Sequence, residues 1–433
     1  MGETKTTTVV IAGLGGRGRI TYAAFALRHP ELMKVTGAAD MNTARREEVR
    51  LAHAIPGENC FETAEEMFAK PKMADMAFIC TQDADHVRHA AMAIRQGYDI
   101  LLEKPVSADI AACRYLDALA RERKAKVTVC HVLRYTPFFR RVKQMIDDGA
   151  LGDIVSIQAS ENVGYWHQSH SFVRGNWRRA DQTSPMILAK CCHDMDMLIW
   201  LASSPCEWVS SFGDIAYFNL AHAPQGSTDF CLKGCKVRES CLYDAEKIYV
   251  RNQVTGYDHN GAGWMQQAVM AAPTEEGLLH ALETSPYGRC VFRCDNDVVD
   301  HQVVTAKMNN GITVSFSMCG FNERNHRMIH IMGTKADLIG DVDADQMTLY
   351  RFGQEPEPIH LHVDEKMGGH NGGDYVMLRE MFALRQHGGE SATALSQSLE
   401  SHYMAMAAEE SRRMEGQRVN VRAFVESFQA QPQ

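Results

Sequence analysis

A glycine-rich sequence near the N-terminus places the strongest constraint on the fold. Gly13-Leu14-Gly15-Gly16-Arg17-Gly18 directly follows the apolar run Thr8-Val9-Val10-Ile11-Ala12 and precedes a predicted helix. In this context the first glycine permits a tight turn, the second lets the backbone approach a pyrophosphate, and the third allows close helix–strand packing. A phosphate would then lie at the positive end of the helix. The pattern predicts a strand–turn–helix unit that binds a dinucleotide.

Residues 1–131 alternate between strand and helix signals. The predicted strands are continuous apolar runs, as expected for parallel strands covered on both faces. They comprise residues 8–12, 35–39, 76–80, 99–102 and 127–130. We therefore predict an N-terminal Rossmann domain, residues 1–131, with a doubly wound parallel sheet.

The pattern changes after residue 131. Alternation of polar and apolar residues predicts strands at 154–158, 207–219, 297–306, 311–319 and 326–333, and helices are predicted at 137–148, 185–201 and 395–413. Such alternation is typical of an antiparallel sheet with one solvated face. Residues 132–433 are thus predicted to form an α+β domain with a large, mostly antiparallel open sheet that binds substrate and supports oligomerisation. Residues 221–290 are irregular and contain cysteines, so we expect an insertion there.

Asp40 stands directly after the second predicted strand. A carboxylate at this position can accept hydrogen bonds from the adenosine ribose hydroxyls and repels a 2′-phosphate, so it favours NAD over NADP. Arg45 and Arg46 follow closely and would favour the phosphate. We interpret these arginines instead as part of a solvated helix face.

Lys104 stands at the end of a later strand of the same predicted sheet. Glu103-Lys104-Pro105 follows the apolar segment Asp99–Leu102. A lone lysine is usually a solvated surface side chain. Open α/β sheets, however, bind ligands at the carboxyl ends of their strands. A cation there would stabilise the charge that develops on a substrate hydroxyl as hydride leaves the carbon.

These motifs, in this order, resemble the glucose–fructose oxidoreductase/inositol dehydrogenase (Gfo/Idh/MocA) superfamily. The resemblance rests on the glycine loop, Thr81 with His86 beyond it, Glu103-Lys104-Pro105 and Arg134-Tyr135-x-Pro137, and it spans nearly the whole chain. It implies NAD-dependent chemistry on a carbohydrate or cyclitol hydroxyl and a homo-oligomer, dimer or tetramer. The residues expected to bind the cofactor are Gly13, Gly15, Gly16, Arg17, Gly18, Asp40, Thr81, His86, Glu103 and Lys104.

A second group of candidate catalytic residues lies on the predicted helix 185–201, where Lys190 and His193 share a face. In the superfamily an Asp-x-x-x-His pair occupies this helix and the histidine acts as acid or base. His193 matches that histidine, but Ala189 stands where the aspartate is expected. Lys190 would lower the pKa of His193 and favour a neutral base. Alternatively, Lys190 pairs with Asp194 and His193 is a packed helix residue. We predict Lys104, His193 and Lys190 as catalytic.

Other polar and aromatic side chains are candidates for sugar binding, in which apolar ring faces meet aromatic groups and hydroxyls meet planar polar groups. The expected substrate-binding residues are Tyr165, Arg174, Trp177, Arg178, His370 and Asp374. The last two stand in the glycine-rich segment 368–374 before a helix, where Asp374 alternatively caps that helix.

Clustered thiols raise the possibility of a structural metal. Cys231, Cys235 and Cys241 lie close together in the expected insertion, and Cys290 or Cys294 would complete a tetrahedral zinc site. The alternatives are free cysteines or an occasional disulfide. An odd total of thirteen cysteines favours a reducing cytoplasm over a disulfide framework.

The bulk properties exclude some classes of protein. A net charge of −9 argues against general nucleic-acid binding, and no apolar run approaches the roughly 20 residues that span a membrane. The sequence therefore favours an NAD-dependent oxidoreductase. Two alternatives stay open. One is a glycosidase that oxidises its substrate transiently with tightly bound NAD and uses Lys190, His370 or Asp374 as an additional base. The other is a non-catalytic NAD-binding sensor.

Overall fold

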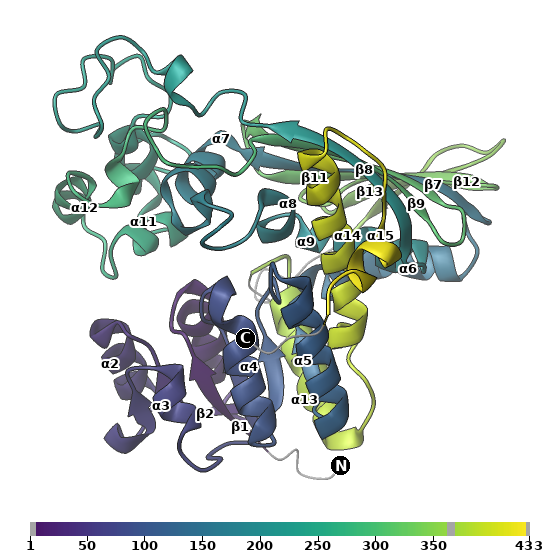
Figure 1. Ribbon diagram of the computed structural model, residues 1–433, viewed down its shortest axis with the longest axis horizontal. Coiled ribbons are helices and arrows are strands. Elements are labelled where there is room, and N and C mark those ends of the chain that lie inside the picture. Colours follow the sequence, from purple (N-terminus) through teal and green to yellow (C-terminus); the bar gives the residue numbers. More distant parts are fainter. Residues whose placement is uncertain (1–5, 362–368, 430–433) are drawn as a thin grey trace.

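The computed structural model describes residues 6–361 and 369–429, which form a Rossmann part and a second part built on a larger sheet (Figure 1). The Rossmann sheet has six parallel strands in the order β3-β2-β1-β4-β5-β6. Its strands are β1 Thr7–Ala12, β2 Met33–Ala39, β3 Cys60–Phe61, β4 Met76–Ile79, β5 Asp99–Leu102 and β6 Val127–Val129. The order reverses between β1 and β4, where doubly wound sheets bind ligands. The predicted doubly wound sheet is confirmed.

The helices between these strands begin with a π-helical segment at the glycine loop, where a conventional helix was expected. They are η1 Gly16–Ala23, α1 Ala24–Arg28, α2 Thr43–Ala52, α3 Ala64–Phe68, α4 His86–Arg95 and α5 Ile110–Arg123. Short 3-10 turns are η2 Gly57–Asn59, η3 Asp83–Asp85 and η4 Val132–Tyr135.

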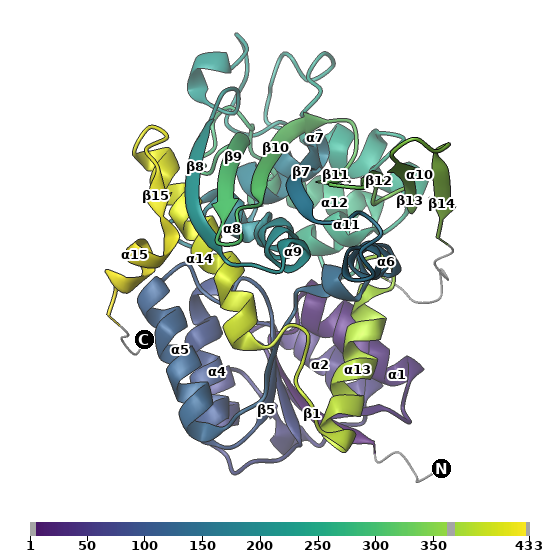
Figure 2. The same cartoon turned by 90° about the vertical axis from the view of Figure 1, so that its right-hand side faces the viewer.

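One helix of the Rossmann layer comes from far along the chain. α13, Gly373–His387, lies beside β1 and α1 (Figure 2). Met377 and Phe382 of α13 share a buried cluster with Ile11 of β1 and Phe25 of α1. This packing brings the N-terminal end of α13 to the glycine loop.

The second part is built on a nine-stranded sheet in the order β14-β13-β12-β11-β7-β10-β9-β8-β15. β7 and β10 are parallel, and the other neighbouring strands are antiparallel, which confirms the predicted mostly antiparallel sheet. The strands are β7 Ile154–Gly164, β8 Cys206–Asp214, β9 His301–Met308, β10 Thr313–Asn322, β11 His326–Gly333, β12 Ala336–Asp341, β13 Gln346–Arg351, β14 Glu357–His360 and β15 Val419–Asn420. β8 ends before the predicted residue 219 because the amide groups of Ala216 and Tyr217 bind the Asp300 carboxylate instead of a strand.

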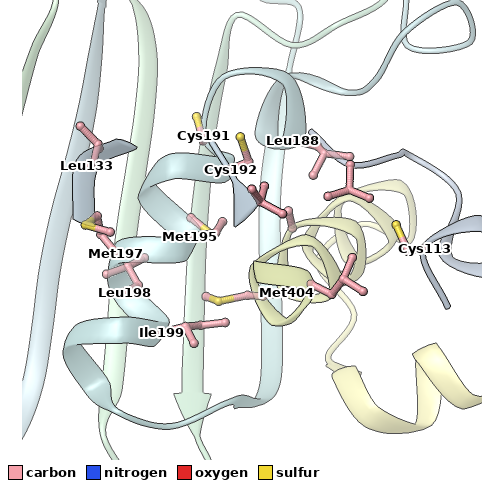
Figure 3. Close-up of a cluster of buried hydrophobic side chains, with 14 of the residues drawn as sticks. Cys113, Leu133, Leu188, Cys191, Cys192, Met195, Met197, Leu198, Ile199 and Met404 are labelled. Atoms are coloured by element: carbon pink, nitrogen blue, oxygen red, sulfur yellow. The ribbon is translucent and has the colours of Figure 1, made fainter. Parts of the chain in front are cut away.

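Helices on one face of this sheet position the site. They are α6 Pro137–Asp147, α8 Met186–Ala189, α9 Cys192–Ala202, α14 Leu395–Arg413 and α15 Val421–Glu426. Met195 and Leu198 of α9 and Met404 of α14 belong to one buried cluster, part of which is drawn in Figure 3. The same cluster includes Val10 of β1, so a continuous core joins the two parts of the chain.

The predicted helix 185–201 is wrong in one respect, because it is two helices. α8 ends at Ala189 and α9 begins at Cys192. The backbone at Cys191, with ψ near 8°, is not helical. Lys190 lies in this break and therefore does not share a helix face with His193.

Short helices separated by loops connect β8 to β9. They are η7 Leu220–His222, η8 Lys247–Arg251, α10 Tyr257–Asn260, α11 Trp264–Val269, α12 Glu275–Leu282 and η9 Pro286–Gly288. This segment has a small core of its own around Ile248, Tyr249 and Leu278. The elements after β7 that pack against it are α7 Tyr165–His167, η5 Gln168–Arg174 and η6 Asn176–Arg178.

Candidate active site

The glycine loop has the shape that a pyrophosphate requires. Gly13 has φ of +88°, and a Cβ there would overlap the carbonyl of Cys80. A Cβ on Gly18 would overlap the carbonyl of Gly13, so both positions need glycine. Gly15 and Gly16, in contrast, border open space, with no heavy atom within 4 Å of a built Cβ. No side chain caps η1 and no acidic residue stands in its first turn, so its amide groups can receive an anion.

Asp40 lies next to this loop. Its Oδ2 accepts a hydrogen bond of 2.6 Å from the amide of Leu14, and its Oδ1 accepts one of 2.7 Å from the amide of Asn42. The guanidinium of Arg46 donates to the Asp40 backbone carbonyl. The structure thus places a half-buried carboxylate beside the glycine loop, as the sequence predicted.

His86, unlike the half-buried Asp40, is completely buried. Its ring nitrogens lie 2.7 Å from the carbonyl oxygen of Pro105 and 3.0 Å from that of Thr81. His86 therefore joins the loops that follow β4 and β5.

Lys104 extends from the end of β5 toward the second part of the chain. Its Nζ donates a hydrogen bond of 2.8 Å to the backbone carbonyl of Ala189, at the end of α8. The neighbouring Glu103 is buried and accepts from Arg17 of the glycine loop at 2.6 Å. Burial raises the pKa of Glu103, but the charge of Arg17 together with the hydrogen bonds from Tyr22 and Arg17 holds that pKa below its ordinary value.

Arg17 also binds Asp374, at the start of α13, at 2.6 Å. Asp374 Oδ2 lies 2.9 Å from Nδ1 of His370. Burial raises the pKa of Asp374, but the charges of Arg17 and His370 hold it well below its ordinary value. Asp374 thus orients His370 instead of standing free for substrate. Gly368, in the same predicted loop, lies outside the described residues.

His193 stands near Lys104 at the start of α9. Burial, followed by the positive charge of Lys104, lowers the pKa of His193 well below its ordinary value. The ring of His370 lies 6.1 Å from that of His193, measured between centroids. The structure therefore brings Lys104, His193 and His370 together, and it keeps His193 neutral and able to accept a proton.

Lys190 does not act on His193 as the sequence suggested. Its ammonium lies 2.9 Å from Oε1 of Glu161, a completely buried carboxylate on β7. Arg327 of β11 contacts Glu161 as well and lies 2.8 Å from Asp194. The expected pairing of Lys190 with Asp194 is therefore wrong. Lys190 and Asp194 belong to the same four-residue ion network, but Lys190 pairs with Glu161 and Asp194 pairs with Arg327.

Three of these groups were missed by the sequence analysis. Glu161 and Arg327 carry no local signal, because their partners are far away in the chain. His131, directly after β6, lies with its Nδ1 2.9 Å from Asp196 Oδ1. The available signal was its position three residues before Arg134 of the Arg134-Tyr135-x-Pro137 motif. Arg134 binds the same carboxylate through two hydrogen bonds of 2.7 Å.

The predicted substrate-binding residues fall into two groups. Trp177 donates to Asp83, in the loop after β4, at 3.2 Å and so bridges the two parts of the chain. Tyr165 is half-buried. Arg174, however, is completely buried and donates to the backbone carbonyls of Arg289 and Tyr243. Arg174 thus holds the segment between β8 and β9 in place.

Arg178 likewise has a partner in that segment, with its Nε 2.9 Å from Oδ1 of Asp295. Arg178 and Arg174 are therefore both engaged in contacts that secure the connection between β8 and β9, and neither guanidinium is free for a sugar in this structure.

The expected zinc site is not assembled. Cys231, Cys235, Cys241 and Cys290 do line one small cavity, and Cys294 lies outside it. Within residues 6–361 and 369–429, however, no group of three or more His, Cys, Asp or Glu side chains is arranged to hold a metal ion. All thirteen cysteines are free thiols. Apolar neighbours such as Val291 and Phe292 share the cavity with the thiols.

In the described part of the chain, no helix combines the length and the apolar character that a membrane crossing requires.

The chain is similar to known proteins in sequence and in fold. YteT of Bacillus subtilis (strain 168), a provisionally named oxidoreductase, is 25% identical over 328 residues, which cover 71% of this chain and 72% of YteT. The scyllo-inositol 2-dehydrogenase (NADP(+)) IolW of the same organism is 26% identical over 164 residues, 38% of this chain and 44% of IolW. A solved levoglucosan dehydrogenase, in complex with NADH and levoglucosan, superposes with a TM-score of 0.69 at 16% identity and covers 96% of this chain and 99% of that one.

Family models match both parts of the chain. Residues 7–131 match the NAD-binding Rossmann fold of an oxidoreductase family, and residues 143–421 match the C-terminal alpha/beta domain of the same family. Together the matched ranges take in most of the sequence, including Lys104 and His193. The protein is therefore an NAD(P)-binding oxidoreductase of the Gfo/Idh/MocA family.

Proposed function

We propose that the protein is an NAD-dependent dehydrogenase that oxidises a hydroxyl group of a carbohydrate or cyclitol. The observation that carries this proposal is the convergence of Lys104 and His193 at the carboxyl ends of the Rossmann strands, beside a glycine loop with space for a pyrophosphate. The similarity to a levoglucosan dehydrogenase and to an inositol dehydrogenase supports the substrate class.

The residues present suit the proton transfers of such a reaction. When bound, NAD supplies the hydride acceptor. The Lys104 ammonium donates a hydrogen bond to the reacting hydroxyl and stabilises negative charge on its oxygen. His193, held neutral by burial, accepts the hydroxyl proton. Trp177 and His370 stand at the site as groups that can contact a sugar ring.

Asp40 supports NAD over NADP, although IolW carries NADP(+) in its name. The experiment compares both cofactors in the wild type and in Asp40→Ser. We expect the wild type to use NAD better, and the variant to gain on NADP by about tenfold or more in relative kcat/KM, because repulsion of the 2′-phosphate is removed. A wild type that prefers NADP would overturn this part of the proposal.

We also propose that the open face of the nine-stranded sheet joins copies of the chain in a cytoplasmic homo-oligomer. Val303 of β9, Met328 of β11 and Ile339 of β12 expose apolar surface. An apolar face of this kind is stabilised by association. Sedimentation of the purified protein, compared with Val303→Lys, tests this.

The main test measures NADH formation with a panel of free sugars, cyclitols and aryl glycosides. We expect NADH in proportion to substrate consumed, without release of the aglycone. The glycosidase alternative relied on Lys190 as an additional base, with His370 and Asp374 as reserves. Lys190 is paired with Glu161 and Asp374 with Arg17, so only His370 still supports that alternative. Failure of every hydroxylated substrate to yield NADH would overturn the proposed function.

A further inference from the structure

Three buried ring nitrogens near the proposed base make no hydrogen bond of good geometry within the described part of the chain: Nδ1 of His193 and both Nδ1 and Nε2 of His131. Nδ1 of His131 lies 2.9 Å from a carboxylate oxygen of Asp196, which leaves Nδ1 of His193 and Nε2 of His131 as the two without an ion-pair partner. The two rings are neighbours, with centroids 5.9 Å apart and an edge-to-face angle of 65°. Leaving one buried polar atom unpaired is unfavourable, and two in adjacent rings indicate a shared interaction.

The far side of His131 is firmly held. Its Nδ1 lies 2.9 Å from Oδ1 of Asp196, which is completely buried and bound by Arg134. Burial raises the pKa of Asp196, but the interactions with His131 and Arg134 together lower that pKa to about 2. Asp196 is therefore a carboxylate at neutral pH, and it can only accept a hydrogen bond from the N–H of His131.

The other groups around the two rings cannot accept a hydrogen bond from Nδ1 of His193. Lys104 and Arg327, which face His193, are donors without an acceptor atom. His370 is largely exposed and its Nδ1 is engaged with Asp374. His402, which stacks on His131, uses both ring nitrogens, since its Nε2 accepts from the Val106 amide and its Nδ1 donates to the Ser398 carbonyl.

We infer that His131 is a positioning residue for His193, accepting a hydrogen bond at Nε2 from the Nδ1–H of His193, directly or through one buried water. Each link then has one donor and one acceptor. Asp196 accepts from Nδ1–H of His131, and His131 accepts from Nδ1–H of His193. His193 is thereby fixed as the tautomer whose Nε2 is free to accept.

This inference rests on the proposed function for its chemical meaning. In the oxidation, the O–H proton of the substrate moves to Nε2 of His193 while hydride leaves the carbon for the cofactor and the C=O bond forms. The resulting imidazolium keeps its Nδ1–H bond to His131, and the negative charge of Asp196 acts on it through that ring. No proton passes beyond His193 in this step.

The kinetic test compares His131→Leu and His131→Gln with wild type. Leucine removes the acceptor, and we expect kcat to fall by about 10- to 100-fold with KM for the sugar and Kd for NAD nearly unchanged. Glutamine offers both an acceptor and a donor and should restore most of the loss. His330→Gln, at a His–Asp pair on β11 and β12, is the matched control. Equal losses in both variants, or a kcat retained in His131→Leu, would overturn the inference.

A spectroscopic test does not depend on activity. Histidine ¹⁵N NMR of the full chain, with the His193 signals assigned from His193→Gln, should show the Nδ1–H tautomer in wild type and in His131→Gln, and a mixture of tautomers in His131→Leu. A protein that oxidises no sugar but shows this pattern would keep the inference and lose the proposed function. A tautomer that is unaffected by His131→Leu would overturn the inference even in an active enzyme.

Discussion

The ammonium group of Lys104 donates a hydrogen bond of 2.8 Å to the backbone carbonyl of Ala189. Lys104 follows β5 in the Rossmann sheet, and Ala189 ends α8 in the second part of the chain. The bond thus fixes the two parts relative to each other at the proposed site of reaction. It also gives the ammonium an oxygen partner at Ala189, the position at which the superfamily resemblance implies an aspartate and this chain has none.

Replacing Lys104 with methionine should remove the charge but keep most of the volume. We expect kcat to fall by about 10²- to 10⁴-fold, because the negative charge on the reacting oxygen is no longer stabilised. The Kd of NAD, measured by calorimetry, should change little. Lys34→Met, at an exposed position on β2, serves as the control. A Lys104→Met enzyme with wild-type kcat would contradict the role of Lys104.

Two alanine substitutions in the glycine loop should affect different properties, one the binding of NAD and the other the stability of the fold. Gly15 has φ of −70°, which alanine adopts, and a Cβ there meets no atom. Gly15→Ala should therefore fold normally but raise the Kd of NAD by about tenfold or more, because the Cβ takes the space of the pyrophosphate. Gly18→Ala, whose Cβ overlaps the Gly13 carbonyl, should instead lower the Tm of the cofactor-free protein by about 5 °C or more. Thermal unfolding and calorimetry of both variants check this contrast, which fails if Gly15→Ala binds NAD as wild type does.

The buried network around Glu161 should be important for stability. Glu161→Gln leaves Lys190 without its carboxylate, and we expect the free energy of unfolding to fall by about 3 kcal/mol or more. Glu207→Gln, which removes a partly exposed carboxylate on β8 paired with Lys307 on β9, is the matched control and should have little effect. Urea unfolding followed by circular dichroism measures both. Equal effects would show that the burial of Glu161 is not decisive.

Buried histidines should make the protein less stable in mild acid. Burial lowers the pKa of His89 to about 4 and those of His170 and His402 to about 3. The unfolded chain binds protons at these residues below about pH 6.5, whereas the folded chain does not. The contribution of these histidines to the free energy of unfolding is therefore complete above that pH. It falls by about 1.4 kcal/mol per pH unit for each histidine as the pH drops. Urea unfolding at a series of pH values checks this, and His402→Gln should reduce the slope by one proton.

The parts of the site that could be predicted from the sequence are those set by local pattern. The apolar run before Gly13 identifies a buried strand, and the glycines after it identify the turn, because both depend on neighbouring residues. The position of Lys104 after a strand of the parallel sheet was predicted for a related reason, since the carboxyl ends of parallel strands meet at one edge of the sheet.

The contacts that could not be predicted join distant segments. Lys190 has an acid four residues away, Asp194, but binds Glu161 on another strand, because a break between α8 and α9 turns the side chain aside. His131 and Asp196 meet only when η4 and α9 pack together. Sequence periodicity indicates that a residue is buried, but it does not identify the partner that it meets.

The contact between Arg17 and Asp374 spans 357 residues of sequence. During synthesis on the ribosome, the N-terminal strands and the glycine loop emerge long before α13 exists. Until then, the apolar surface of β1 and α1 that α13 later covers stays in water, and Arg17 lacks one of its two carboxylates. A nascent chain of this protein therefore completes the ion pairs of Arg17 only after α13 has been synthesised, and until then its uncovered apolar surface needs protection from aggregation.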